Sequence, residues 1–264
     1  MYRLVAMDLD KTLLDENGGI PDEVAERLRH LNTEGVHFAL CTGRVSRSAE
    51  HYSKIIGGAS IASFNGSYIR TEDGDVYTSK IPLALAEDVV DFCYDNDVYI
   101  QLYDGETILV DHYTKELETD HDIDFTEYRE LGDLRKAELC DTPKLIALKM
   151  TDEVQDVILR MRERFPQLTM NNSSRYVIEI MPKGVDKGYG LSIIADALGI
   201  RKEETMAIGD SMNDLAMLEW AGLGVAVSNA DDRLKAAADV VTGRPMSFGV
   251  LEILDRFFND RKRS

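Results

Sequence analysis

Two aspartates near the N-terminus, Asp8 and Asp10, have a spacing that suits metal or phosphoryl chemistry. They follow a short apolar run at residues 4–7. In an extended segment, alternation points both carboxylates to one side, where they repel each other unless a cation lies between them. A calcium loop is excluded, because Leu13 stands where its turn glycine is required and no glutamate closes the loop. Magnesium fits better, since it takes few carboxylates and keeps water molecules that a phosphate can displace. For this pair alone, a turn or helix-capping role stays an alternative.

Further polar clusters stand directly after other short apolar runs. In open parallel sheets, ligands bind beyond the carboxyl ends of the strands, so these positions are candidates for a common site. Taken singly, each cluster has a structural explanation as a turn, and Lys187 alone could be a surface lysine. The clusters are Thr42-Gly43-Arg44 after residues 36–40, Asn65-Gly66 after 60–64, Gly209 to Asp214 after 205–208, and Lys187-Gly188 at the start of a helical pattern.

The order of the predicted elements indicates an α/β fold, with a doubly wound parallel (Rossmann-like) core interrupted by an inserted α+β domain. The first 80 or so residues alternate strand and helix patterns, as a parallel sheet with crossover helices requires. From Pro82 the pattern changes to α+β, and alternation resumes after Gly184. We therefore expect core segments at 1–83 and 185–264 and an inserted domain at 84–184.

The individual elements are predicted from apolar periodicity and from helix start and stop signals. In the core we expect strands at 4–7, 36–40, 60–64, 205–208, 223–227 and 239–242, and helices at 21–35, 186–198 and 231–238 and from 213 and 247. In the insert we expect helices at 83–94 and 153–165 and strands at 99–103, 107–110, 144–150 and 176–181, with an acidic helical stretch between the strands at 107–110 and 144–150.

The composition limits the partners. The 264 residues carry a formal net charge of −18, which repels nucleic acid and anionic membranes, so neither is expected as a partner. An anionic substrate would need a local cation. Three scattered cysteines have no zinc-type spacing and are expected to be reduced thiols. No apolar stretch is long enough for a signal peptide or membrane span, so we expect a cytoplasmic protein. We expect a monomer or a weak homo-oligomer.

In their order and combination the clusters resemble those of the haloacid dehalogenase superfamily of phosphotransferases. Within it, the chain resembles the Cof-like phosphatases, which carry a large α/β cap inserted after the third core strand. The resemblance spans essentially the whole chain, and its first and last motifs are the most specific. The motifs are DLDKT at 8–12, TGR at 42–44, KG at 187–188 and GDSMND at 209–214.

The resemblance implies a role for each charged residue. Asp8 would be the nucleophile that forms an aspartyl-phosphate. Asp10 would protonate the leaving alkoxide, then take a proton from the hydrolytic water, and its backbone carbonyl would bind the metal. Lys187 and Mg²⁺ would offset the negative charge of the substrate. Asp210 would bind Mg²⁺ together with Asp8, and Asp214 would either bind it through water or orient Lys187.

Polar residues would complete the phosphoryl site by the same resemblance. Thr42, Gly43 and Asn213 would hold the phosphoryl group. Arg44 and Asn65 would contact the substrate or the cap. Thr12 would order the nucleophile loop, and the cap would exclude water and select the leaving group.

The expected function is Mg²⁺-dependent hydrolysis of phosphomonoesters of small metabolites, sugar phosphates above all. An alternative is a phosphomutase of hexose phosphates, because the phosphomannomutases resemble this family in motif and cap. A non-enzymatic alternative is a receiver-like domain whose Asp8 is phosphorylated as a signal. Asp10 favours hydrolysis or transfer over a long-lived phosphorylated form, and a receiver needs no large cap.

Overall fold

The computed structural model describes residues 1–113, 125–151, 153–172 and 176–258. The chain forms two compact units, of which one comprises Met1–Tyr77 and Asp186–Ser264, and the other Thr78–Val185. We call them the core unit and the cap unit. The change in sequence pattern placed the domain boundaries at 83/84 and 184/185, whereas the two units divide at 77/78 and 185/186. Cys41, Cys93 and Cys140 are free thiols.

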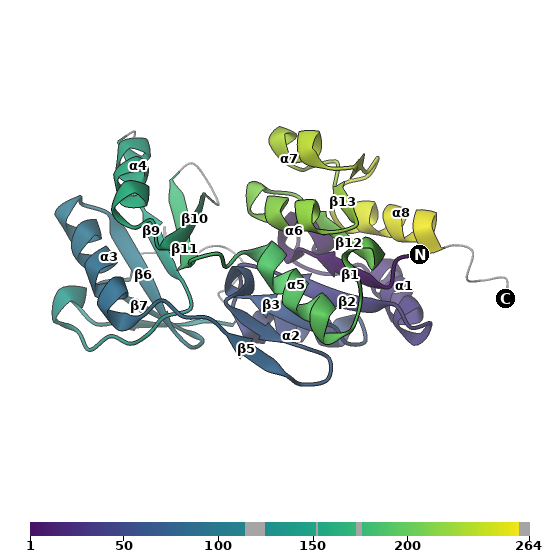
Figure 1. The fold of residues 1–264 in the computed structure, drawn as a ribbon, viewed down its shortest axis with the longest axis horizontal. Helices are drawn as coiled ribbons and strands as arrows, with labels where there is room; N and C mark the ends of the chain where they lie inside the picture. Colours follow the sequence, from purple (N-terminus) through teal and green to yellow (C-terminus); the bar gives the residue numbers. More distant parts are fainter. Residues whose placement is uncertain (114–124, 152, 173–175, 259–264) are drawn as a thin grey trace. The chain divides into compact units, whose positions relative to one another are not determined.

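The core unit is built on one sheet with strand order β14-β13-β12-β1-β2-β3-β4-β5. From β14 to β3 neighbouring strands are parallel, and β4 runs antiparallel to β3. The chain moves outward from β1 to β3 in one direction and from β12 to β14 in the other, so its topological switch point lies between β1 and β12 (Figure 1). The strands are β1 (Leu4–Met7), β2 (His37–Cys41), β3 (Ser60–Ser63), β4 (Tyr68–Arg70), β5 (Val76–Thr78), β12 (Thr205–Gly209), β13 (Leu223–Ala226) and β14 (Val240–Val241).

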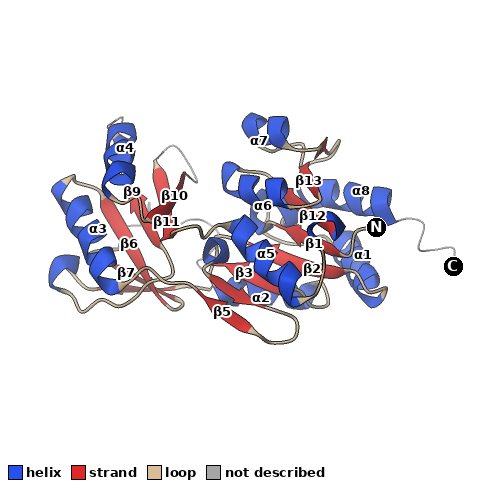
Figure 2. Cartoon of the chain, in the orientation of Figure 1, coloured by secondary structure: helices blue, strands red, loops and turns tan. Residues whose placement is uncertain are grey.

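Helices cover both faces of the core sheet, which explains why β1 and β12 are buried along their whole length. Helix α1 buries Val24, Leu28 and Leu31, the stripe expected from the sequence, and α1 packs beside α8. On the other face α5 packs beside α6 (Figure 2). The predicted parallel α/β core is therefore confirmed. The helices are α1 (Asp22–Thr33), α2 (Ser46–Ile55), α5 (Lys187–Ala197), α6 (Leu215–Trp220), α7 (Asp232–Ala237) and α8 (Met246–Phe258).

Helix α2 was not predicted from the sequence. Most of the side chains that it buries are small or polar: Ser46, Ser48, Ala49 and Ser53, with Tyr52. Buried apolar residues at helical spacing are present in Val45, Ala49, Tyr52 and Ile56, but polar residues separate them and the first and last flank the helix. This helix follows the TGR motif directly and packs on β3, so it is part of the scaffold of the site.

The cap unit is a mixed sheet with strand order β10-β11-β9-β6-β7-β8, in which β7 and β8 are parallel and the other pairs antiparallel. Helices α3 and α4 pack on it around a separate apolar cluster. The acidic helical stretch expected between residues 110 and 144 is wrong for Glu127–Glu130, which form β8, a mostly exposed strand with the residues EYRE. Residues 114–124 of that stretch lie outside the described residues. Strand β10 was not predicted from the sequence. The elements are α3 (Leu83–Asp95), β6 (Tyr99–Asp104), β7 (Thr107–Val110), β8 (Glu127–Glu130), β9 (Leu145–Leu148), α4 (Val154–Arg164), β10 (Leu168–Asn172) and β11 (Val177–Pro182).

A buried ion pair lies on the cap sheet. Ile178 and Ile180 of β11 belong to the apolar cluster that the helices cover, so Glu179 between them points to the opposite face. There its carboxylate accepts a hydrogen bond from the ammonium group of Lys144, and both side chains are buried. None of the described helices has the length and apolar character that crossing a bilayer demands.

Candidate active site

Asp8 lies immediately beyond β1 at the switch point of the core sheet. Met7 pairs with Leu40 on one side and with Ile208 on the other, and the N–H of Asp8 donates to the Ile208 carbonyl at 3.0 Å. The side chain is 4% exposed. Asp8 therefore stands where open α/β sheets bind their ligands.

The chain turns sharply after Asp8 through an irregular helical segment, η1 (Leu9–Leu13). The N–H of Leu13 donates to the Asp8 carbonyl at 3.2 Å, and Lys11 has a φ of 55°. Asn229, from the loop after β13, donates to the Lys11 carbonyl at 2.8 Å. The turn is thus fixed by contacts from both its own backbone and a distant loop.

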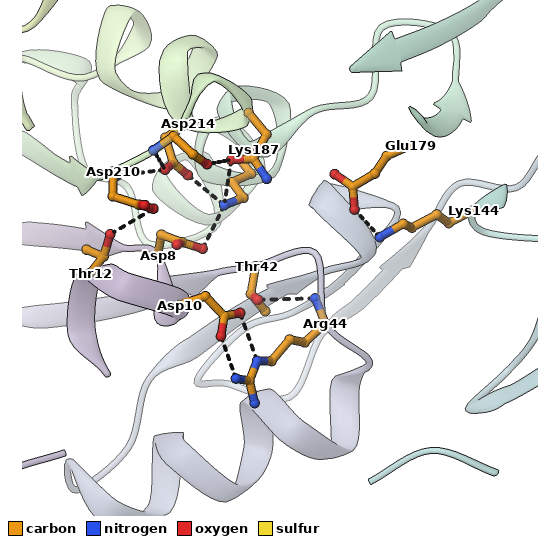
Figure 3. Close-up of polar contacts among 12 residues, drawn as sticks. Asp8, Asp10, Thr12, Thr42, Arg44, Lys144, Glu179, Lys187, Asp210 and Asp214 are labelled. Atoms are coloured by element: carbon orange, nitrogen blue, oxygen red, sulfur yellow. Dashed lines mark hydrogen bonds and ion pairs between the residues drawn. The ribbon is translucent and has the colours of Figure 1, made fainter. Parts of the chain in front are cut away.

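Lys187 places its ammonium group beside Asp8, the candidate nucleophile. Its Nζ lies 2.7 Å from Asp8 Oδ1 and 2.6 Å from Asp214 Oδ1, and the residue is 1% exposed (Figure 3). The side chain of Asp186 caps α5 by accepting from the Tyr189 N–H at 2.8 Å, which sets where the helix begins.

Helix packing explains why a glycine, Gly188, follows this lysine. A Cβ on Gly188 would lie 2.6 Å from the carbonyl oxygen of Ala216 in α6. Glycine therefore lets α5 and α6 approach closely enough to bring Lys187 beside the GDSMND loop.

Asp214 is held by the loop after β12 and by Lys187 of α5. Its Oδ2 accepts from the N–H groups of Asp210 and Ser211 at 2.9 and 3.0 Å, while Oδ1 accepts from Lys187. A Cβ on Gly209 would lie 2.5 Å from that of Asp214, so the glycine makes room for this side chain. Asn213 Oδ1 lies 3.4 Å from Lys187 Nζ.

The carboxylates are crowded, and this changes their proton affinity. Burial raises the pKa of Asp8 well above its usual value, against the opposing effect of Lys187, and Asp214, Asp210 and Asp10 raise it further. Burial likewise raises the pKa of Asp210 to about 7, with Asp214 adding to the rise. Burial disfavours the charged form of Lys187, but the charges of Asp214 and Asp8 together outweigh this and hold its pKa above the usual range. The site thus holds more negative charge than one ammonium group neutralises.

This donor set fits a hard divalent cation. One carboxylate oxygen from each of Asp8, Asp210 and Asp214 lies within 4.8 Å of the others, and all three residues are buried. Thr12 Oγ1 donates to Asp210 Oδ1 at 3.4 Å. Clustered carboxylate oxygens are the ligands that Mg²⁺ prefers. Because Asp214 is already occupied by three donors, Asp8 and Asp210 are the carboxylates best placed to bind a metal directly.

Asp10 turns its carboxylate away from this cluster and toward Arg44. The two residues form a forked ion pair, with Nε to Oδ2 at 2.9 Å and Nη2 to Oδ1 at 2.5 Å (Figure 3). The sequence expectation for Arg44 was contact with the substrate or the cap. In the structure its guanidinium group binds Asp10, the residue expected to be the acid and base.

Thr42 and Asn65 lie together after β2 and β3. The N–H of Asn65 donates to the Thr42 carbonyl at 2.9 Å, and Thr42 Oγ1 accepts from the Arg44 N–H at 3.1 Å. Gly43 lies between these two anchored residues and is partly exposed. A Cβ on Gly66, whose φ is +97°, would lie 2.4 Å from the Asp186 carbonyl oxygen. This contact joins the turn after β3 to the start of α5.

Sequence reasoning missed Ser48 and Tyr52, which lie behind Arg44. They follow Arg44 by four and eight residues, the spacing of one helix face. This spacing is present in the sequence, but it places the three residues together only if residues 46–55 form a helix.

Buried carboxylates and a lysine lie at the switch point of a parallel sheet, and a second domain is inserted into the chain, an arrangement suited to phosphoryl transfer. The sequence profile of the haloacid dehalogenase-like hydrolases matches residues 5–254. The chain belongs to this family, as one of its Cof-like phosphatases with an inserted cap, and such enzymes act on small phosphorylated metabolites.

Individual relatives match this chain over nearly its full length. A phosphoglycolate phosphatase of Archaeoglobus fulgidus is 32% identical over 254 residues, which cover 96% of this chain and 95% of the relative. The putative phosphatase YxeH of Bacillus subtilis is 29% identical over 266 residues, covering 95% and 96%. The crystal structure of a haloacid dehalogenase-like hydrolase from Bacteroides thetaiotaomicron is 26% identical and superposes with a TM-score of 0.85 over 98% of this chain and 100% of that one. The recognised family and fold are therefore confirmed.

Proposed function

We propose that this chain hydrolyses phosphomonoesters of small metabolites, sugar phosphates among them, by a Mg²⁺-dependent route through an aspartyl-phosphate on Asp8. The observation that carries the proposal is the contact of Lys187 Nζ with Asp8 Oδ1 at 2.7 Å. A buried nucleophilic carboxylate and a phosphate dianion repel each other, and a fixed cation at the nucleophile offsets that repulsion.

In the first step a carboxylate oxygen of Asp8 forms a bond to phosphorus, while the bond from phosphorus to the ester oxygen breaks. The departing alkoxide takes a proton from the Asp10 carboxyl group. Burial raises the pKa of Asp8 even with Lys187 beside it, and a bound divalent cation would favour the ionised form. An ionised aspartate needs no activating base.

In the second step water attacks the phosphorus of the aspartyl-phosphate and gives one proton to Asp10. The Asp8 carboxylate leaves, which restores the nucleophile, and Asp10 regains the proton that it donated. The enzyme therefore returns to its starting state with no outside acid or base consumed.

Asp8 and Asp210, with the backbone carbonyl of Asp10, would hold the metal ion. A bound Mg²⁺ supplies charge stabilisation at the phosphoryl oxygens. Asp214 orients Lys187, because one of its oxygens binds the lysine while the other accepts two backbone N–H groups. The carboxylate cluster within 4.8 Å supports this assignment.

Thr42, Gly43 and Asn213 hold the phosphoryl group in this proposal. Thr42 and Gly43 follow β2, the strand beside β1, and Asn213 lies beside the ammonium group of Lys187. Backbone N–H groups and small polar side chains at strand ends are suited to phosphate oxygens.

The test is a phosphate-release screen over hexose, pentose and short acid phosphoesters, with and without Mg²⁺. The relatives carry different substrate names, phosphoglycolate in Archaeoglobus fulgidus and 5-amino-6-(5-phospho-D-ribitylamino)uracil in Bacillus subtilis, so both classes belong in the screen. We expect release that requires Mg²⁺ and disappears in Asp8→Asn. Metal-independent release that survives in that variant would overturn the mechanism.

The same screen separates a hydrolase from a mutase. A hexose 1-phosphate is incubated with the protein, and free phosphate is measured beside the 6-phosphate isomer. We expect free phosphate as the main product. Predominant formation of the isomer would instead establish phosphate return to a second hydroxyl group.

A further inference from the structure

The carboxylate of Asp10 is held by a guanidinium fork. Arg44 donates to both carboxylate oxygens, through Nε at 2.9 Å and Nη2 at 2.5 Å. A planar guanidinium matches a carboxylate in this two-bond geometry and fixes its orientation, which a lysine ammonium cannot do.

Side chains of α2 hold the guanidinium group of Arg44 in place. The residue is 5% exposed, and its Nη1 donates to Ser48 Oγ at 3.1 Å. Its Cζ lies 5.5 Å from the centre of the Tyr52 ring, and the Tyr52 hydroxyl donates to the Gly18 carbonyl at 2.9 Å. Helix α2 thus supplies two supports for one guanidinium group, and one of them is tied to the loop that follows η1.

The backbone around Asp10 is irregular. This residue lies in η1 with non-helical φ and ψ of −67° and 126°, and 32% of its side chain is exposed. A short side chain on a partly exposed turn can rotate between rotamers. Proton transfer to a leaving oxygen requires the donor within hydrogen-bond reach, so rotation would lower the rate.

We propose that Arg44 is the positioning residue of Asp10 and acts on catalysis through it, instead of binding the phosphoryl group. The inference rests on the proposed function, because it gives Asp10 its acid and base role. When Asp10 carries its proton on one oxygen, that oxygen no longer accepts from Arg44, and the other bond of the fork still holds the group. Arg44 therefore contacts Asp10 through two hydrogen bonds when the carboxylate is ionised and through one when it is protonated.

A double-mutant cycle tests the proposal. The variants are Arg44→Lys, Asp10→Asn and the two combined, assayed on an alkyl phosphate from the screen in the presence of Mg²⁺. Arg44→Lys keeps the charge but loses the fork. We expect its kcat to fall by about 10- to 100-fold, because a misplaced Asp10 loses part of the roughly 100- to 10,000-fold that general acid and base catalysis contributes. We expect KM to change by no more than about twofold, and the combined variant to be no slower than Asp10→Asn alone.

Inorganic phosphate is the probe for the opposite role. If Arg44 binds the phosphoryl group, Arg44→Lys will raise both KM and the inhibition constant of phosphate, and the losses in the double variant will add. Either result overturns the proposal. A phenyl ester with an acidic leaving group gives a further reading, because it departs without a proton. Its phosphorylation step should be affected less by Arg44→Lys than that of an alkyl ester.

Two more variants separate a loss of Asp10 positioning from a general loss of structure. Ser48→Ala leaves the fork in place and removes one support of Arg44, and we expect a decrease in kcat of a few fold that vanishes in the Asp10→Asn background. An equal decrease in both backgrounds contradicts the proposal. Arg27→Lys is the matched control, because Arg27 is a mostly buried arginine whose Nε binds Asp255 at 2.9 Å within the core unit. It should lower the melting temperature without changing kcat.

The unsubstituted protein is assayed first. If it shows no Asp8-dependent phosphate release, the proposed function fails and the role of Arg44 fails with it. If release is present and the double-mutant cycle is additive, the role of Arg44 alone is overturned.

Discussion

Metal affinity should depend steeply on pH, because the carboxylate that would bind the metal holds a proton near neutrality. Burial raises the pKa of Asp210 to about 7, and the charge of Asp214 adds to the rise. A metal ion binds the ionised carboxylate, so protons compete with it below this pKa. The change to be made is in pH: the same protein is titrated with Mg²⁺ at pH 7.5 and at pH 5.5.

The size of the effect follows from the pKa. With a pKa of about 7, roughly three quarters of Asp210 is ionised at pH 7.5 and roughly one thirtieth at pH 5.5. If this one proton competes with the metal, the apparent affinity should fall about 25-fold between the two conditions, which corresponds to about 1.9 kcal/mol. The raised pKa of Asp8 would steepen the dependence further.

Isothermal titration calorimetry with Mg²⁺ measures this dependence directly. Asp210→Asn should bind Mg²⁺ much more weakly at both pH values. Asp196→Asn, at an exposed position on the same helix as Lys187, should bind as the unsubstituted protein does. Equal affinity at both pH values, or unchanged affinity in Asp210→Asn, would refute the reasoning.

The same pKa shift predicts how the metal-free protein responds to pH. The pKa of Asp210 is higher in the folded chain than in the unfolded chain, so its contribution to stability is fully present below the unfolded value of about 3.9 and is lost as pH rises through about 7. Bound Mg²⁺ should offset this loss. Added Mg²⁺ should therefore raise the melting temperature more at pH 8 than at pH 5.5, which differential scanning calorimetry would measure.

The remaining predictions concern single contacts. Asp8→Asn should reduce phosphate release to the assay background while preserving the fold by circular dichroism. Lys187→Met should destabilise the metal-free protein by about 3–5 kcal/mol in urea at pH 8, because two buried carboxylates lose their cation. Gly66→Ala should destabilise by about 2–4 kcal/mol through its clash with Asp186; Gly74→Ala, with a φ of +90° but open space, should destabilise by only about 1 kcal/mol. Lys144→Met should destabilise by about 3–5 kcal/mol, and adding Glu179→Leu should recover much of this loss; no recovery would show that the pair does not account for the effect.

Much of the fold follows from local sequence signals. Strands β1 and β12 are short apolar runs ended by polar clusters, and α1 has a regular apolar stripe, so each was predictable within a residue or two. The elements that sequence reasoning missed have weaker signals. Strand β8 is an exposed polar strand with no apolar alternation. Helix α2 has apolar residues at helical spacing in Val45, Ala49, Tyr52 and Ile56, but buried serines stand between them and obscure the pattern.

The sequence by itself determined which residue types stand at the strand ends and in what order, because motifs such as DLDKT and GDSMND are contiguous. Only the tertiary structure decided how they pair. Lys187 lies 179 positions from Asp8 in the chain and 2.7 Å from it in space. Whether Asp214 faces the lysine, and whether Arg44 faces Asp10, depends on rotamers set by packing and by hydrogen bonds from distant loops. A linear pattern carries no record of those directions, since side-chain orientation is fixed only when the surrounding elements close around it.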